Sequence, residues 1–372
     1  SVNQINIDKR DFTDVKVIID QNIVTYDGHS KNPEITVIEN WAGASGEKVD
    51  EVEYTKYWTD ERGNRVEELK NAGTYTVRLM GAGNNYVANT IAATFTIKQC
   101  EIEPEITGNT LIKIYDGTSD IAKDQELSII LKTSDSEADL ADDIYADSVD
   151  WAYDSNEVGV CHLNAANITV AGENAKNYEL TKDYASIEGE IVSRDFASMT
   201  VSAAPLTYNG TEQQPKIDAS VETGLENVSP DATFTYSKDG VNYQSEIPGF
   251  TEAGTYLVYV KASMANFNDE TKTVAVTVQK AAAPTVSAMS ESYSYKETGE
   301  RQVALPGFPE DCGTIGSITA QIISDEGQIL DSAAVDGMNL VLRLKGSSKN
   351  MVGKTAQVVV KVETKNYEDI QI

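Results

Sequence analysis

Carboxylates are the most abundant side chains in this sequence that could do chemistry. Aspartate and glutamate total 59 residues against 30 lysines and arginines. They are densest between residues 135 and 150, which read DSEADLADDIYADSVD. Carboxylate oxygens bind calcium, and Asp142, Asp143 and Asp147 are the candidate ligands. Their spacing lacks the D-x-[DN]-x-[DN]-G order of calcium loops, so a solvated acidic loop is the competing interpretation.

Patterns that signal catalysis are missing from the sequence. There are two histidines, His29 and His162, and no CxxC, HExxH, GxSxG, P-loop or GxGxxG pattern. Cys161 and His162 are neighbours that would point to opposite faces of a strand. A glycosidase needs two carboxylates facing each other across a cleft, and no one pair stands out. We therefore predict that the chain is not an enzyme; an accessory region of a carbohydrate-active enzyme is the remote alternative.

Aromatic side chains form the second group of candidates. On a strand, Tyr54 and Trp58 share one face, from which they could stack on sugar rings or anchor a protein partner. Packing of the same face into the core is the alternative. Trp41 and Trp151 are lesser candidates for the same role.

The three cysteines do not define a disulfide framework. Cys100, Cys161 and Cys312 are an odd number. A bridge between Cys100 and Cys161 and a set of separate buried thiols both remain open.

Charge and hydropathy exclude several partners. The formal net charge of −29 argues against nucleic acid, which requires a basic surface, and against anionic membranes. No run of about 18 apolar residues is present, so we expect no membrane insertion in this segment. The charge itself favours solubility. No signal peptide is visible in these residues, and we expect them to be a fragment of a longer protein.

The elements that would position these side chains are short strands. Period-two alternation recurs, as in TYTVRLM from Thr74 and TYLVYV from Thr255, with Gly, Asn and Asp between the segments. Asp239-Gly240 is a hairpin signal. No sustained 3.6-residue pattern is found. We predict an all-β chain of small β-sandwich domains, with a β-grasp fold, which needs a helix, as the alternative.

The sequence repeats with a period of about 90 residues, which indicates serial domains. An early Tyr-Asp/Asn-Gly recurs at Tyr26, Tyr115 and Tyr208, and a late Asn-aromatic pair follows about 60 residues later in each repeat. The fourth repeat has SYSYKETG in place of the early motif. The early motif predicts a turn with glycine at positive φ, and the late pair predicts a buried aromatic beside a turn-forming Asn. The predicted repeats are residues 1–99, 100–193, 194–280 and 281–372.

Nothing between these repeats looks like a flexible linker. The junctions read FTIKQCEIEPEI, GEIVSRDFASM and VTVQKAAAPTV, without Gly/Ser-rich or Pro-rich spacers. We expect each last strand to pass directly into the next first strand. An extended, semi-rigid and monomeric rod follows from that expectation.

The repeat motifs resemble a known group of modules. YDG/YNG, AGTY and the late Asn-Tyr are similar to the MBG repeats of large bacterial surface proteins, which are immunoglobulin-like β modules. The second repeat resembles the related YDG repeat of adhesins, through IYDGTSDIA from Ile114 and ITVAGENAKNYELT from Ile168. The third repeat is the best match, with LTYNGTEQQPKI and AGTYLVYVKASMANFND. The fourth departs most, with GKTAQVVVKV in place of AGTY.

The resemblance implies a location and a role. The location is the surface of a bacterium, most consistent with a Gram-positive one, or the secreted fraction. The role is a stalk that projects or spaces other domains, and the alternative is an adhesin that binds a glycan or a host surface protein. The resemblance implies no catalytic residues. The sequence leaves open whether calcium or Lys–Asn cross-links, which stiffen some Gram-positive surface repeats, stiffen this chain.

Overall fold

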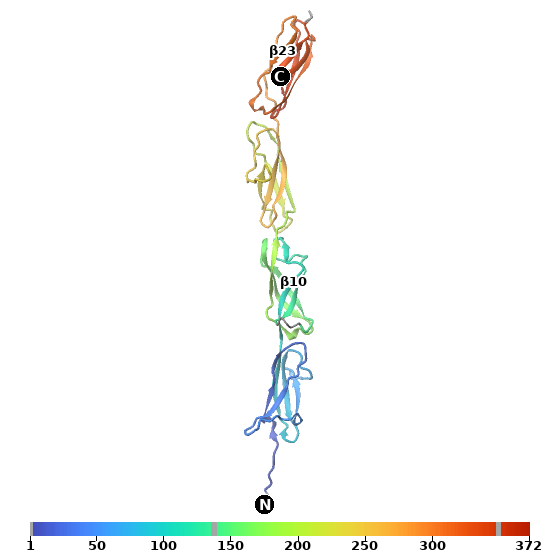
Figure 1. Cartoon of the computed structure of the whole chain (residues 1–372), viewed down its shortest axis with the longest axis vertical. Helices are drawn as coiled ribbons and strands as arrows, with labels where there is room; N and C mark the ends of the chain where they lie inside the picture. The colour runs from blue at the N-terminus through green and yellow to red at the C-terminus, as the bar shows by residue number, and fades with distance from the viewer. Residues whose placement is uncertain (1–2, 135–139, 347–350) are drawn as a thin grey trace. The chain divides into compact units, whose positions relative to one another are not determined.

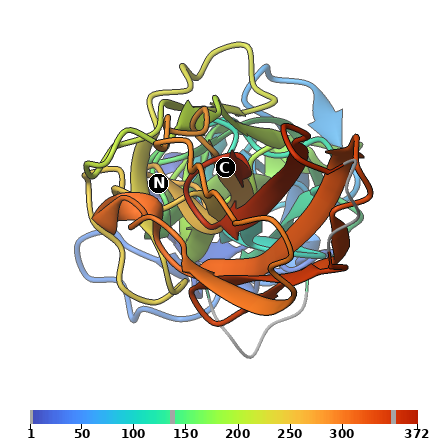
Figure 2. The same ribbon diagram turned by 90° about the horizontal axis from the view of Figure 1, so that it is seen from above.

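The computed structural model describes residues 3–134, 140–346 and 351–372, and strands joined by turns and loops run through all of them (Figures 1 and 2). The helical elements in these ranges are 3-10 turns of three residues. The predicted all-β fold is confirmed. The β-grasp alternative would need a helix across a sheet, and the described residues form none. They also include no helix long and apolar enough to cross a membrane.

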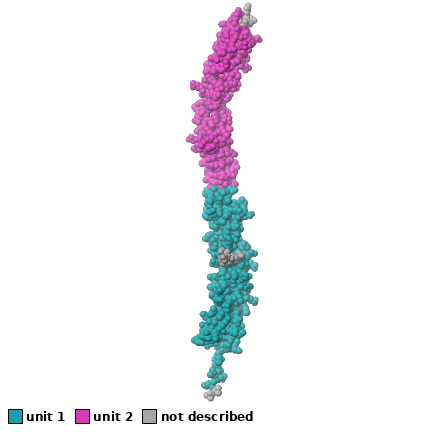
Figure 3. Space-filling view, in the orientation of Figure 1, with its two compact units in different colours: residues 1–192 teal, residues 193–372 magenta. Residues whose placement is uncertain are grey.

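The chain divides into two compact units, residues 1–192 and 193–372 (Figure 3). Each unit contains two β-sandwiches, which we number first and second in unit 1 and third and fourth in unit 2. The repeat boundaries predicted from the sequence stay a prediction.

The first sandwich combines a five-stranded sheet in the order β3-β9-β7-β5-β6 with the pairs β2-β4 and β1-β8. Its strands are β1 (Arg10–Asp11), β2 (Val15–Ile19), β3 (Ile23–Thr25), β4 (Ile35–Glu39), β5 (Tyr54–Thr59), β6 (Arg65–Val66), β7 (Gly73–Gly81), β8 (Tyr86–Val87) and β9 (Thr90–Lys98), with 3-10 turns η1 (Phe12–Asp14) and η2 (Glu51–Glu53).

The second sandwich has sheets in the orders β12-β10-β15 and β11-β16-β14-β13. Its strands are β10 (Cys100–Gly108), β11 (Ile112–Ile114), β12 (Leu127–Thr133), β13 (Tyr145–Tyr153), β14 (Gly159–Ala171), β15 (Tyr178–Leu180) and β16 (Ala185–Val192), with η3 (Ala175–Asn177).

The third sandwich has sheets β17-β19 and β18-β22-β21-β20, and the fourth has β23-β26-β25 and β24-β27-β28. The strands of the third are β17 (Ser198–Ala203), β18 (Leu206–Thr207), β19 (Ile217–Glu222), β20 (Thr233–Ser237), β21 (Gly254–Ser263) and β22 (Glu270–Gln279). Those of the fourth are β23 (Gly299–Ala304), β24 (Ile315–Asp325), β25 (Leu330–Asp336), β26 (Asn339–Leu344), β27 (Ala356–Thr364) and β28 (Ile370–Gln371), with η4 (Glu310–Cys312).

One strand arrangement recurs in the first three sandwiches. The last strand lies between a short parallel strand that precedes the Tyr-x-Gly turn and a long antiparallel strand, which carries the AGTY sequence in the first and third sandwiches. Each last strand is therefore flanked on both sides. Its alternate residues pack inward, as a strand with one buried face requires.

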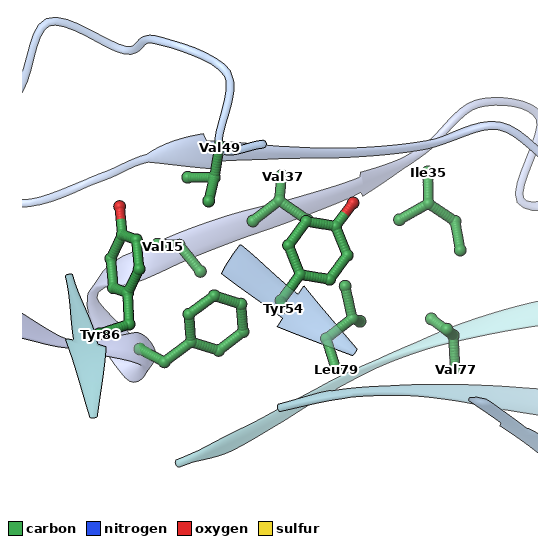
Figure 4. Close-up of a cluster of buried hydrophobic side chains, with 9 residues drawn as sticks. Val15, Ile35, Val37, Val49, Tyr54, Val77, Leu79 and Tyr86 are labelled. Atoms are coloured by element: carbon green, nitrogen blue, oxygen red, sulfur yellow. The ribbon is translucent and has the colours of Figure 1, made fainter. Parts of the chain in front are cut away.

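The core of the first sandwich shows how this alternation is used. Along β7, Tyr75, Val77 and Leu79 are buried, whereas Met80 is 41% exposed. Figure 4 shows Val77 and Leu79 facing Val37, which comes from the opposite sheet, with Tyr54 beside them. The apolar side chains of two sheets thus meet in one cluster.

Truncation of adjacent β7 residues tests this assignment. Leu79→Ala removes a side chain with 0% exposure and should destabilise the first sandwich by about 2–5 kcal/mol, because it leaves a cavity. Met80→Ala, on the opposite face, should cost less than about 1 kcal/mol. Urea unfolding of both variants measures the difference, and equal losses would show that the face assignment is wrong.

Candidate functional site at the junction between sandwiches

The late Asn-aromatic pair lies beside the segment through which the chain enters its own sandwich. In every sandwich the chain enters through a parallel pairing with the aromatic of that pair. The four pairings are Arg10 with Tyr86, Cys100 with Tyr178, Arg194 with Phe267, and Ala281 with Tyr367. The entry point of each sandwich therefore lies beside its Asn-aromatic pair.

In unit 1, the Asn of this pair also contacts the preceding sandwich. Asn177 is fully buried. Its Oδ1 accepts a hydrogen bond from the backbone N–H of Ala72 at 2.9 Å, and its Nδ2 donates to Oδ1 of Asn71 at 3.1 Å. Ala72 opens the AGTY sequence of the first sandwich. One side-chain amide therefore satisfies polar groups of both sandwiches, each of which would be costly to bury alone.

Two tyrosines and one carboxylate complete the unit 1 junction. Tyr26, from the Tyr-Asp-Gly turn of the first sandwich, meets Tyr178 edge to face with ring centroids 5.5 Å apart. Their hydroxyls donate to the same oxygen, Oδ2 of Asp142, at 2.6 and 3.0 Å. Oδ1 of Asp142 accepts from Asn174 at 2.7 Å. The carboxylate thus bridges the first sandwich to two segments of the second.

A glycine allows the close approach at this junction. Gly28 has φ +78°, and a Cβ placed on it would lie 2.5 Å from Cβ of Ala141. The third residue of the Tyr-Asp-Gly turn therefore has both a conformational and a steric reason to be glycine. The predicted turn with positive φ is found at Gly28, Gly117 and Gly210.

In unit 2 the late Asn accepts the corresponding hydrogen bond from the preceding sandwich but donates to its own sandwich. Asn366 is 2% exposed, and its Oδ1 accepts from the backbone N–H of Ala253 at 3.0 Å. Its Nδ2 donates to the carbonyl of Asp311 at 2.9 Å. Lys365 and Glu252 add an ion pair across the same junction. Ala253 opens the second AGTY sequence, as Ala72 opens the first.

The tyrosine pair is repeated as well. Tyr208 and Tyr367 lie edge to face with centroids 5.4 Å apart. The Tyr367 hydroxyl donates to Oδ2 of Asp311 at 2.7 Å, and the Tyr208 hydroxyl donates to the Asp311 carbonyl at 2.8 Å. Asp311 occupies the place of Asp142, although its backbone carbonyl replaces one carboxylate oxygen as acceptor.

The junctions shift the pKa values of their tyrosines. Burial, and then the hydrogen bond and charge of Asp142, raise the pKa of Tyr26 to about 12. The same causes raise the pKa of Tyr178. The hydrogen bond to Asp311, with burial, raises the pKa of Tyr367 to about 12. Deprotonation removes the donor and places a charge beside a carboxylate, so the protonated hydroxyl is the form that holds the junction.

The three candidate calcium ligands have different surroundings in the structure. Asp142 accepts the junction hydrogen bonds, whereas Asp143 and Asp147 are exposed. Among the described residues no group of three His, Cys, Asp or Glu side chains is arranged to hold a metal ion. Residues 135–139 of the acidic segment lie outside the described residues.

The candidate binding aromatics face the interior. Tyr54 is 5% exposed and belongs to the core cluster of the first sandwich (Figure 4). Trp58 is half-buried and meets Phe95 with ring centroids 6.1 Å apart. Trp41 is half-buried under the guanidinium of Arg10. A binding role for Tyr54 and Trp58 stays a prediction.

The remaining reactive side chains have structural partners. No disulfide joins Cys100, Cys161 and Cys312, of which Cys161 and Cys312 are buried and Cys100 is partly exposed. His162 contacts Asp154, and His29 contacts Asp27. Lys113, whose side chain has 0% exposure, pairs with Asp116 at 2.8 Å and donates to two backbone carbonyls. The sequence did not single out Lys113, because a lysine beside an exposed turn looks like an ordinary surface residue.

One protein family matches part of this chain. The YDG domain family matches residues 98–186, within unit 1. No curated protein matches the chain.

Solved structures of similar length give weak likenesses. They include extracellular cadherin domains 3–6 of protocadherin gamma B2 (10% identity, covering 96% of this chain and 97% of that one, TM-score 0.24) and the insect immune protein hemolin (10% identity, 96% and 98%, TM-score 0.20). The human desmocollin-1 ectodomain has 11% identity over 98% and 79%, with a TM-score of 0.19. TM-scores of this size carry no argument about function.

The tyrosine pKa values predict loss of stability in alkali. A hydroxyl whose folded pKa lies above the unfolded value of about 10 contributes stability below pH 10, and this is lost as the pH rises towards 12. Urea midpoints of the intact chain between pH 9 and 12 measure the decline. In the double variant Tyr26→Phe and Tyr178→Phe the decline in unit 1 should be shallower. An unchanged pH dependence would contradict a role for these hydroxyls.

Asn177→Ala tests the amide bridge. It removes the acceptor of the half-buried Ala72 N–H, which should cost about 0.5–1.5 kcal/mol. Hydrogen exchange of the Ala72 amide should then accelerate by about tenfold or more. The control Asn84→Ala alters an exposed asparagine of the first sandwich and should leave that amide protected. Equal protection in both variants would show that the bridge does not stabilise the junction.

Proposed function

We propose that this chain is a non-catalytic spacer segment of an extracellular bacterial surface protein, built from YDG-type and MBG-type repeats. The observation that carries the proposal is the recurrence of one junction in both units, made from the same three repeat positions. These positions are the Tyr of the Tyr-x-Gly turn, the Ala of AGTY and the late Asn-Tyr pair.

The chemistry of the junction supports mechanical coupling. Its hydrogen bonds centre on the buried amides of Asn177 and Asn366, so changing the angle between two sandwiches would leave these amides unpaired. The connecting chain is also short. A single residue, Gln99, separates β9 from β10, and its side chain donates to the carbonyls of Lys176 and Tyr178. Such a connection restricts bending between neighbours.

The partners of the junction carboxylates and of Tyr54 support a non-catalytic role. The junction carboxylates of Asp142 and Asp311 accept hydrogen bonds from tyrosines of the fold itself. The Tyr54 side chain is buried in the core of the first sandwich. A spacer uses such groups for rigidity, whereas an enzyme needs them free to face a substrate.

The remaining parts of the proposal concern location and source. The YDG match and the MBG-like motifs favour the surface of a bacterium, and the acidic, cysteine-poor composition favours a Gram-positive one. The negative charge suits solubility at a crowded surface and disfavours nucleic acid as a partner.

The test of the spacer role is the spread of distances within unit 2. Spin labels introduced with non-natural amino acids at Val241 and Met338 lie on exposed positions of the third and fourth sandwiches. Pulsed dipolar spectroscopy of the intact chain should give one narrow distance distribution. Asn366→Ala should broaden it, because the Ala253 N–H loses its acceptor. A broad distribution in the unaltered chain would contradict the spacer function.

A further inference from the structure

The Tyr-x-Gly turn carries a carboxylate in the first two sandwiches and an amide in the third. Asp27, Asp116 and Asn209 stand at the middle position of this turn. Asn209 and Gly210 form the one Asn-Gly pair in the sequence. In such a pair the side-chain amide can cyclise onto the next backbone nitrogen, because glycine has no side chain to obstruct the ring.

The turn of the third sandwich repeats the hydrogen bonds of the second. Oδ1 of Asp116 accepts from the N–H of Thr118 at 2.9 Å and from its hydroxyl at 2.8 Å. Oδ1 of Asn209 accepts from the N–H and the hydroxyl of Thr211 at the same two distances. The two turns therefore differ in the charge of their middle residue and not in how its side chain is held.

Where the middle residue is an aspartate, a lysine balances its charge. In the first sandwich Lys31 pairs with Asp27 at 2.5 Å. In the second sandwich the buried Lys113 pairs with Asp116 at 2.8 Å. The two lysines come from opposite sides of the turn in sequence, so each sandwich supplies the cation in its own way.

The third sandwich has a lysine at neither of these positions. Gln213 stands where the first sandwich has Lys31, because each forms an isolated antiparallel bridge with the residue three before the Ala of AGTY. Leu206 stands where the second sandwich has Lys113, two residues before the Tyr of the turn. The neutral Asn209 thus occurs in the turn that has no lysine to balance a charge.

We propose that Asn209 is a site of spontaneous modification, at which attack by the Gly210 nitrogen converts the side-chain amide to a carboxylate. The Gly210 nitrogen loses its proton to solvent and forms a bond to Cγ of Asn209, which places a negative charge on Oδ1. The Cγ–Nδ2 bond then breaks, and Nδ2 takes up a proton and leaves as ammonia. Water opens the resulting cyclic imide at either carbonyl, which gives aspartate or isoaspartate.

The geometry of the turn favours the ring-forming step. The hydrogen bond from the Thr211 N–H closes a ring of atoms that contains both Cγ of Asn209 and the Gly210 nitrogen, so the reacting atoms stay close together. Both donors of Thr211 point at Oδ1, the atom on which the negative charge develops. Asn209 is exposed, so water reaches it and ammonia can leave.

The new charge would lie at the junction between the third and fourth sandwiches. A Cβ placed on Gly210 would be 3.7 Å from Oδ2 of Asp311, an acceptor of the junction hydrogen bonds. In unit 1 the equivalent charge acts on the junction tyrosine: burial is the main cause of the raised pKa of Tyr26, and the charge of Asp27 adds to it. Conversion of Asn209 therefore adds an unbalanced negative charge near a carboxylate and weakens the junction.

Peptide mapping by mass spectrometry of the folded, intact chain after incubation in mildly alkaline buffer tests the reaction. Asn209 should convert faster than every other asparagine, and the products should include isoaspartate, which arises from ring opening. Thr211→Val should slow the conversion several-fold, because it removes one donor to Oδ1. The matched control Thr211→Ser keeps this donor and should convert at the original rate. Equal rates in the two variants, or an Asn209 that stays intact, would overturn the proposal.

The variant Asn209→Asp, which has the sequence of one product, tests the effect on the junction. Hydrogen exchange of the Ala253 amide, whose acceptor is Asn366, should accelerate by about twofold to fivefold. Adding Gln213→Lys supplies the lysine that the first sandwich has at this place and should restore the original rate. An exchange rate that Asn209→Asp leaves unchanged, or that Gln213→Lys does not restore, would overturn the role of the unbalanced charge.

Discussion

The buried side-chain amide of the late Asn-Tyr pair is the interaction on which the coupling of neighbouring sandwiches depends. Asn177 and Asn366 each accept a hydrogen bond from the N–H of an alanine in the preceding sandwich and donate to a nearby oxygen. An amide is suited to this place because it satisfies a donor and an acceptor without a charge. The edge-to-face tyrosines then shield these hydrogen bonds from water. Breaking one of the bonds therefore costs more free energy, because the separated groups have no water to pair with.

Much of the fold followed from the sequence because its signals are local. Period-two alternation, Asp-Gly and Tyr-Asp-Gly turns, and the absence of a helical period act over a few residues and predict strands and turns directly. The positive φ of Gly28, Gly117 and Gly210 belongs to this class. The last strands also follow the alternation, with Phe95 and Ile97 buried.

The role of the repeat motifs could not be predicted in the same way. The sequence indicated that the late aromatic is buried, but it did not indicate that Tyr178 and Tyr367 pack edge to face against the tyrosine of the preceding sandwich. No local pattern shows which surface covers a side chain. For the same reason Asp142 looked like a calcium ligand in an acidic loop, whereas its contacts are tyrosine hydroxyls that lie far away in the sequence.

The central claim is that two neighbouring sandwiches hold a fixed relative orientation. Residual dipolar couplings of backbone amides in the weakly aligned, intact chain test it most directly, because each sandwich reports its own alignment tensor. For the third and fourth sandwiches we predict tensors of the same magnitude and orientation. Tensors that differ in magnitude would mean that the sandwiches reorient independently, and would contradict the account.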